Sequence, residues 1–133
     1  WDGSPYAGFS TVEPWLPLGP DHAIANVAAQ ARDPASMLTL HRRLIALRRA
    51  HPALSVGDVT VLTGANDVLA YVRSHGDERF VVALDFSHQP RDVPLPEAAG
   101  GRIVLATGLD RDGEIVGENL RLGADEGVVI AVD

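Results

Sequence analysis

The feature that most constrains the fold is a series of short apolar runs that begins near Val56, with no helical period between them. Turn-forming sequences rich in Gly, Asp and Asn separate the runs, at 64–67, 74–77, 98–101, 110–113 and 123–127. Several short strands at this spacing predict an antiparallel sandwich or barrel. The predicted strands are Val59–Leu62, Val68–Arg73, Arg79–Ser87, Arg102–Thr107 and Gly127–Val132, with weaker ones near Val93, Ile115 and Leu120.

The run at 79–87 has apolar residues on both faces, which is typical of a central strand covered on both sides. Phe80, Val82, Leu84 and Phe86 fall on one face, and Val81 and Ala83 fall on the other.

One helix is predicted upstream, over residues 34–50. Asp33 is a suitable N-cap, and Pro34 suits the first helical position. The helix is expected to end before Pro52, because the residue preceding a proline avoids the α region. Its apolar face comprises Met37, Leu40, Leu44 and Leu47, widened by Leu38 and Ile45.

Residues 1–33 are predicted to form a loop, because four prolines interrupt any regular pattern. The loop holds four of the seven aromatic side chains of the chain, namely Trp1, Tyr6, Phe9 and Trp15. A loop of this length is uncommon in a compact domain unless it is functional or lies against a larger body.

Composition argues against several classes of function. The net charge of −7, without a basic stripe, disfavours nucleic-acid binding. No apolar run reaches the roughly 20 residues of a membrane helix, and no secretory leader is visible. All 11 basic residues are Arg, which suggests a GC-rich bacterial genome, and the lack of Cys is consistent with the cytoplasm. We therefore expect no nucleic-acid partner, no membrane and a cytoplasmic bacterial location.

Two patterns were weighed as metal sites. The five histidines, His22, His41, His51, His75 and His88, lack the spacing of a zinc motif and are predicted to be solvated. The sequence of Asp110, Asp112, Gly113 and Glu114 has the alternating carboxylates of a calcium loop. However, Asn119 stands where such a loop has its bidentate Glu, so a hairpin turn is favoured.

No nucleophile elbow, phosphate loop or carboxylate dyad is evident, so we assign no catalytic residue, metal or cofactor. The candidate site is Trp1 with Asp2, because an indole can stack on a sugar ring and a carboxylate can accept its hydroxyl hydrogens. The alternative is that these aromatic residues only anchor the loop.

The order of motifs is more specific. The loop carries Trp1-Asp2, Ala7–Ser10 and Pro14–Pro17, followed by Asn26-Val27, Gln30, Asp33-Pro34 and Ser36, then Leu44, Ile45, Leu47 and Arg48 in the helix. This order resembles the C-terminal part of bacterial α-glucosidases, above all oligo-1,6-glucosidases, of the α-amylase superfamily (glycoside hydrolase family 13). Trehalose synthases and sucrose isomerases are similar. The resemblance is specific over 1–52 and weaker over 53–133, where Asp85 replaces a usual Asn.

The resemblance implies a mainly β fold: an antiparallel β-sandwich of the α-amylase domain C type. A long loop and one α-helix from the end of a (β/α)8 barrel would precede it. It implies a barrel part at 1–52 and a sandwich domain at 53–133. The implied activity is retaining hydrolysis of terminal α-linked glucose from short oligosaccharides.

In that family the catalytic Asp and Glu lie on upstream barrel strands. The chain alone is therefore expected to be inactive and structural, with the upstream barrel as its partner and Trp1 and Asp2 near the substrate. The alternative is a stand-alone β-sandwich module that binds carbohydrate or a protein. It would need an aromatic platform built from Tyr71, Phe80 and Phe86, although both phenylalanines are predicted to lie in the core.

Overall fold

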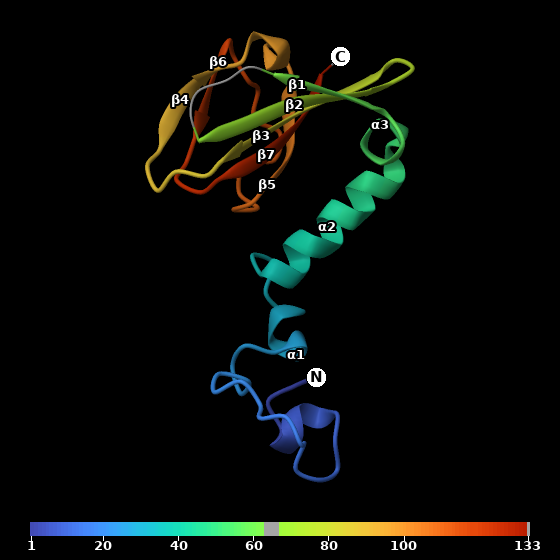
Figure 1. Ribbon diagram of the computed structural model, residues 1–133, viewed down its shortest axis with the longest axis vertical. Coiled ribbons are helices and arrows are strands. Elements are labelled where there is room, and N and C mark those ends of the chain that lie inside the picture. Colours follow the sequence, from blue (N-terminus) through green and yellow to red (C-terminus); the bar gives the residue numbers. More distant parts are fainter. Residues whose placement is uncertain (63–66, 133) are drawn as a thin grey trace. The chain divides into compact units, whose positions relative to one another are not determined.

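The computed structural model describes residues 1–62 and 67–132 (Figure 1). The chain forms two compact units, Trp1–Arg42 and Arg43–Asp133. The division falls within a helix, whereas the sequence places the domain boundary after residue 52. Of the predicted turn at 64–67, only Asp67 belongs to the described residues.

The first unit consists mainly of turns, as predicted, and contains no strand. Two short helical segments interrupt it, a 3-10 turn at Pro5–Gly8 (η1) and α1 at Val27–Gln30. The helix α1 begins where the Asn26 side chain accepts a hydrogen bond from the Ala29 amide at 2.9 Å. Such an N-cap satisfies a backbone donor that otherwise lacks a partner.

The main helix, α2, spans Met37–Ala50 and begins three residues later than predicted. Asp33 does accept a hydrogen bond from the Ala35 amide, but it closes an isolated turn. Ser36 is the residue that caps α2, because its hydroxyl accepts from the Thr39 amide at 3.2 Å and its carbonyl accepts from the Leu40 amide. The predicted cap, Asp33, is therefore wrong, because it precedes the helix by a separate turn.

The predicted apolar face of α2 is only partly covered. Leu40 is buried and Leu47 is half-buried, but Met37 and Leu44 are exposed. Two of the four residues of this apolar face are therefore exposed in the described part of the chain. A single-turn helix, α3 at Pro52–Ser55, follows directly.

The second unit contains an antiparallel β-sandwich, and all of its named strands match runs predicted from the sequence. The larger sheet has the order β1-β2-β3-β7-β5, which places β3 in the centre as predicted, and β4 and β6 form the second sheet. The run near Ile115 forms only one bridge, to Arg102. The strands are β1 (Asp58–Leu62), β2 (Val68–His75), β3 (Glu78–Asp85), β4 (Arg91–Pro94), β5 (Arg102–Ala106), β6 (Asn119–Leu122) and β7 (Gly127–Val132).

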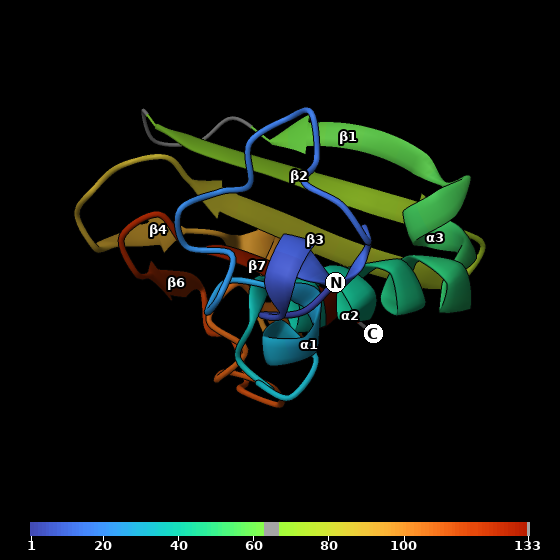
Figure 2. The same cartoon turned by 90° about the horizontal axis from the view of Figure 1, so that it is seen from below.

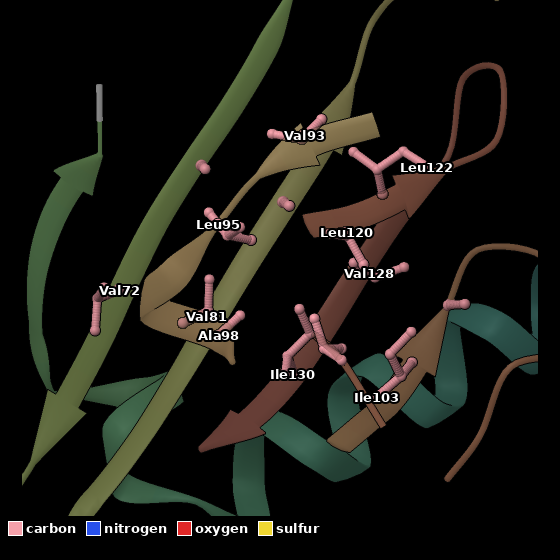
Figure 3. Packing of buried hydrophobic residues seen from close by; sticks show 14 residues of the cluster. Val72, Val81, Val93, Leu95, Ala98, Ile103, Leu120, Leu122, Val128 and Ile130 are labelled. Carbon is pink, nitrogen blue, oxygen red and sulfur yellow. The ribbon is translucent and has the colours of Figure 1, made fainter. Parts of the chain in front are cut away.

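The hydrophobic core lies between the two sheets (Figure 3). The register pairs Val81 with Ile130 and Ala83 with Val128, so these side chains share the inner face of the larger sheet. The second sheet and the 3-10 turn at Pro96–Ala98 (η2) close the other side. The labelled core residues are Val72, Val81, Val93, Leu95, Ala98, Ile103, Leu120, Leu122, Val128 and Ile130.

One end of the outer face of the larger sheet is covered by a short helix. There α3 packs against β2 and β3 (Figure 2), and Phe80 is buried as predicted. Phe86 is 64% exposed, so its assignment to the core is wrong. It lies one residue beyond the end of β3.

A buried carboxylate holds the connection between the two sheets. The Asp85 side chain has no exposed surface, and it accepts hydrogen bonds from the Ser87 amide and hydroxyl, both at 3.0 Å. The Arg91 Nε lies 3.4 Å from its Oδ1. Burial raises the pKa of Asp85, but the Ser87 hydrogen bonds and the Arg91 charge together outweigh it and lower the pKa below 3.8. Asp85 therefore links the end of β3 to the start of β4.

We expect Asp85→Ala to lower the midpoint of thermal unfolding at pH 7 by roughly 5 °C or more, because it removes the partner of buried donors. A group with a lowered folded-state pKa stabilises the fold above its unfolded-state pKa and loses this effect as the pH falls through the folded value. The difference in unfolding midpoint between the variant and the unmodified protein should therefore narrow only below about pH 3.8. Circular dichroism melts between pH 7 and pH 3 measure this, with the exposed Asp77→Ala as control. Equal melts for both variants at pH 7 would contradict the assignment.

Candidate functional site

Trp1 lies on the surface of the first unit with its indole 74% exposed. Its ring centroid is 5.9 Å from that of Phe9, and the two planes are tilted by 56°. The Trp1 carbonyl accepts a hydrogen bond from the Ala28 amide at 3.0 Å, which ties the start of the loop to α1. The backbone is thus held while the ring remains available for contact.

The Asp2 carboxylate is oriented by its own loop. It accepts hydrogen bonds from the Ser4 hydroxyl and, at 2.9 Å, from the Ser4 amide. These two bonds, the hydroxyl first, lower the pKa of Asp2, so the carboxylate is ionised at neutral pH. A Cβ at position 8 would lie 2.6 Å from the Asp2 Oδ1, so Gly8 leaves the space that this carboxylate occupies.

The backbone that follows Asp2 is strained. Tyr6 and Ala7 have φ values of 59° and 57°, and Gly8 continues the left-handed run at 68°. Left-handed conformations are costly for residues with a Cβ, and such strain gathers at functional sites. The Asp2 amide donates to the Ala7 carbonyl at 3.1 Å, so this strained turn closes directly over the Trp1-Asp2 segment.

The four loop aromatics do not form a single platform. Trp1 and Phe9 form the one ring contact of the first unit, and Trp15 is 90% exposed without a ring partner there. The sequence predicts both a sugar platform and a simple anchor as possible roles. The geometry brings together Trp1, Phe9 and Asp2 and leaves Trp15 apart.

The histidines are scattered, and the described part of the chain has no group of three or more His, Asp or Glu side chains suited to a metal. His41, His75 and His88 are exposed, as predicted for solvated residues. The prediction is wrong for His22 and His51, which are half-buried. The His22 Nδ1 lies 3.0 Å from the Gly19 carbonyl, and the His51 Nδ1 lies 3.1 Å from the Glu78 Oε1. His88 lies 3.0 Å from the Asp125 carboxylate, which raises its pKa.

The segment around Asp112 is a turn, as favoured by the sequence. Gly113 has a φ of 87°, its amide donates to the Ile103 carbonyl at 2.8 Å, and Ile103 donates to the Glu114 carbonyl at 2.9 Å. The Glu114 carboxylate binds Arg111 through two nitrogens, at 2.6 and 2.8 Å, so it is already committed to an ion pair. The hydrogen bonds to Arg111 lower the pKa of Glu114.

Sequence reasoning missed the structural roles of the arginines. Arg111 also donates to Glu126 and to the Arg121 carbonyl, at 2.8 and 2.9 Å, and so joins three segments. Its pKa is raised by these carboxylates, first of all by the hydrogen bonds to Glu114. The only signal for such a role was the choice of Arg over Lys at every basic position, since the planar guanidinium can bind several acceptors at once.

Known proteins resemble this chain over both of its parts. Residues 1–57 match the family described as alpha amylase, catalytic domain, and residues 59–124 match the family described as maltogenic amylase, C-terminal domain. Within the described residues, no helix is long and apolar enough to cross a membrane.

Three relatives illustrate the sequence similarity. A probable alpha-glucosidase of Rhizobium meliloti is 38% identical over 96 residues, which are 72% of this chain and 17% of that protein. A glucan 1,6-alpha-glucosidase of Streptococcus pneumoniae is 36% identical over 71% of this chain and 18% of its own length. An oligo-1,6-glucosidase of Parageobacillus thermoglucosidasius is 32% identical over 73% and 17%. The chain thus spans less than a fifth of these relatives.

Among solved structures, the trehalulose synthase MutB of Pseudomonas mesoacidophila MX-45 superimposes with a TM-score of 0.89 at 30% identity. The superposition covers 100% of this chain and 24% of that enzyme. The fold is therefore a β-sandwich of the α-amylase type that follows part of a barrel. On the agreement of both domain matches, the relatives and the fold, the chain belongs to the α-amylase family of glycoside hydrolases, with an α-glucosidase-like sequence.

Proposed function

We propose that this chain is the end of the catalytic barrel and the C-terminal sandwich of an α-glucosidase that releases terminal α-linked glucose from short oligosaccharides. The observation that carries this proposal is that catalytic-domain and C-terminal-domain matches follow one another, at 1–57 and 59–124. The α-glucosidase names of the relatives support the substrate class.

The chemistry would reside outside this chain. Retaining hydrolysis needs two carboxyl groups about 5 Å apart, and in a barrel enzyme the catalytic groups lie at the ends of strands. The first unit consists of turns and helices without a strand, so it offers no such strand ends. The partner of the chain is then the remainder of the barrel, and an α-glucosidic oligosaccharide is the substrate of the whole enzyme.

Within the whole enzyme, Trp1 and Asp2 would contact the substrate or line its entrance. The indole is exposed, the carboxylate is ionised and held by Ser4, and the strained turn at Tyr6 and Ala7 stiffens the segment. An aromatic face beside an oriented carboxylate is suited to a glucose ring and its hydroxyls.

A sugar isomerase is the second candidate for the whole protein. The observation in its favour is the similarity over the full chain to a trehalulose synthase, one variant of which was solved in complex with the substrate sucrose. Product analysis of the whole enzyme with sucrose and with isomaltose separates the two. Glucose release from isomaltose indicates the hydrolase, and a rearranged disaccharide from sucrose indicates the isomerase.

The surface where the barrel docks would be the uncovered end of the outer sheet face. The register β1-β2-β3 places Val61 and Leu69 on this face, and both are exposed. The same face is covered at its other end by α3, which belongs to the catalytic-domain match. Residues of the catalytic-domain match already cover part of this apolar face. The exposed part is therefore suited to bind the rest of the same domain.

We expect the purified 133-residue chain to release no nitrophenol from a nitrophenyl α-glucoside, because the catalytic carboxylates lie outside it. The measurement is absorbance against a buffer blank, with the whole enzyme as positive control. Release above the blank by the chain alone would refute this part of the proposal.

In the whole enzyme, Trp1→Ala should lower kcat/KM for isomaltose by about fivefold, since an aromatic contact of this kind contributes about 1 kcal/mol. Trp15→Ala is the matched control and should change kcat/KM by less than about twofold. Equal effects of the two substitutions would show that Trp1 has no particular role at the substrate site.

For the docking surface, Val61→Asp in the whole enzyme should lower the thermal midpoint by several degrees, because it buries an unpaired charge at the interface. In the 133-residue chain, where position 61 is exposed, the effect should be small. Asn119→Asp adds the same charge on the exposed side of β6 and should be neutral in both. A stand-alone sandwich module predicts no difference between the whole protein and the chain.

A further inference from the structure

The junction between α2 and the sandwich is held by side chains from the β2–β3 hairpin. The short helix α3 forms this junction, and its Ala53 is fully buried. The Ala53 amide donates to the Glu78 Oε2 at 3.1 Å, and the Ala53 carbonyl accepts from the Arg73 Nε at 3.0 Å. The Glu78 carboxylate and the Arg73 guanidinium, on neighbouring strands, therefore bind the amide and the carbonyl of Ala53.

The same two side chains make a second contact each. The Glu78 Oε1 lies 3.1 Å from the His51 Nδ1, directly before α3, and Arg73 donates to the Gly57 carbonyl at 2.9 Å, directly after it. The His51 ring also packs edge-on against Phe80, with ring centroids 4.8 Å apart. Each end of α3 is thus fixed by one charged side chain of the hairpin.

The electrostatics favour an ionised carboxylate at this place. The hydrogen bond from the Ala53 amide, followed by that from His51, lowers the pKa of Glu78 against the effect of burial. His75, a titratable neighbour, is the strand partner of Glu78 on β2, and its charge also lowers the pKa of Glu78. Hydrogen bonds to a charged group are about twice as strong as neutral ones, so these contacts are well suited to hold a backbone segment.

The backbone of the junction leaves no room for a side chain at position 57. A Cβ at position 57 would lie 2.5 Å from both the Ala53 and the Ser74 carbonyl oxygens. The Gly57 amide returns to the Pro52 carbonyl at 3.1 Å, so the chain turns sharply between α3 and β1. Because Pro52 has no amide hydrogen and excludes a continuous helix, the direction of α2 depends on contacts made after its end as well as on contacts of α2 itself, such as the ion pair of Arg43 with Asp112.

We propose that Glu78 and Arg73 form a clasp on α3 that sets the direction in which α2 leaves the sandwich. The β2–β3 hairpin is then the positioning element of the junction. If the chain has the function proposed above, the clasp positions the last barrel helix against the C-terminal domain. The geometry of the clasp itself is independent of that function, since it involves only residues of this chain.

The test uses the absence of cysteine from the sequence, which allows two unique spin labels. One is attached at Arg48→Cys on α2 and the other at Glu118→Cys on the sandwich, and both positions are exposed. Electron paramagnetic resonance then measures the distribution of distances between the labels. We expect a single narrow distribution in the parent protein and a clearly broader one in Glu78→Ala.

Glu78→Gln retains an acceptor for the Ala53 amide and should restore much of the narrow distribution. Asp77→Ala, an exposed carboxylate on the same hairpin, is the matched control and should leave it unchanged. Hydrogen exchange provides the second readout: Glu78→Ala should reduce protection of the Ala53 amide by roughly tenfold or more, while Val81 in β3 remains protected.

An unchanged distance distribution in Glu78→Ala would overturn the proposal. So would loss of protection at Val81 and Ala53 together in Glu78→Gln, because it would indicate a general effect on folding. The outcome does not depend on activity. The distance measurement on the labelled chain tests the clasp, and the separate assay of the whole enzyme tests the assignment as an α-glucosidase segment. Failure of one is therefore distinguished from failure of the other.

Discussion

The pairing of β3 with β2 on one side and β7 on the other is the constraint on which the second unit depends. Because side chains alternate along a strand, this single register decides which residues face the second sheet and which face outwards. The inner set, with Val81 and Ala83 at its centre, is fully buried. The outer set, which includes Phe80 and Val82, needs its own cover, and α3 supplies part of that cover where it packs against β2 and β3.

Arginine side chains connect the elements that the core does not reach. Arg73 holds α3, Arg91 lies beside the buried Asp85, and Arg111 joins the turn after β5 to the turn before β7. The guanidinium groups of Arg91 and Arg111 meet carboxylates, and those of Arg73 and Arg111 bind backbone carbonyls. A sandwich with one two-stranded sheet is thereby closed at its edges by charged hydrogen bonds as well as by apolar packing.

The strands were well predicted from the sequence because period-two alternation and Gly- or Asp-rich turns are local signals. The β3 run, apolar on both faces, even identified the central strand. The start of α2 was misplaced, because Asp33, the predicted cap, closes a separate turn and Ser36 caps the helix three residues later. Phe86 was wrongly placed in the core, because the sequence shows which side of a strand a residue occupies but not how far the cover on that side extends.

For the candidate site, the sequence identified Trp1 and Asp2 and missed the left-handed turn at Tyr6 and Ala7, which no composition rule predicts for residues with a Cβ. It also missed the clasp, in which Arg73 of β2 and Glu78 of β3 bind the backbone of Ala53 in α3. Contacts between residues distant in sequence leave no periodic trace. Local patterns predicted the helices and strands, but they could not predict the contacts that orient these elements.

The position of β7 has a consequence for biosynthesis. It is the last strand along the chain, yet it lies between β3 and β5 and joins them into one sheet. A ribosome that has completed everything up to residue 126 has produced a β1-β2-β3 meander and a separate β5 with no strand to pair it. Any premature stop before this point removes an interior strand, so truncated products expose two unpaired edges and are open to proteolysis or aggregation. The sandwich can thus be completed only after nearly the whole chain described here has been synthesised.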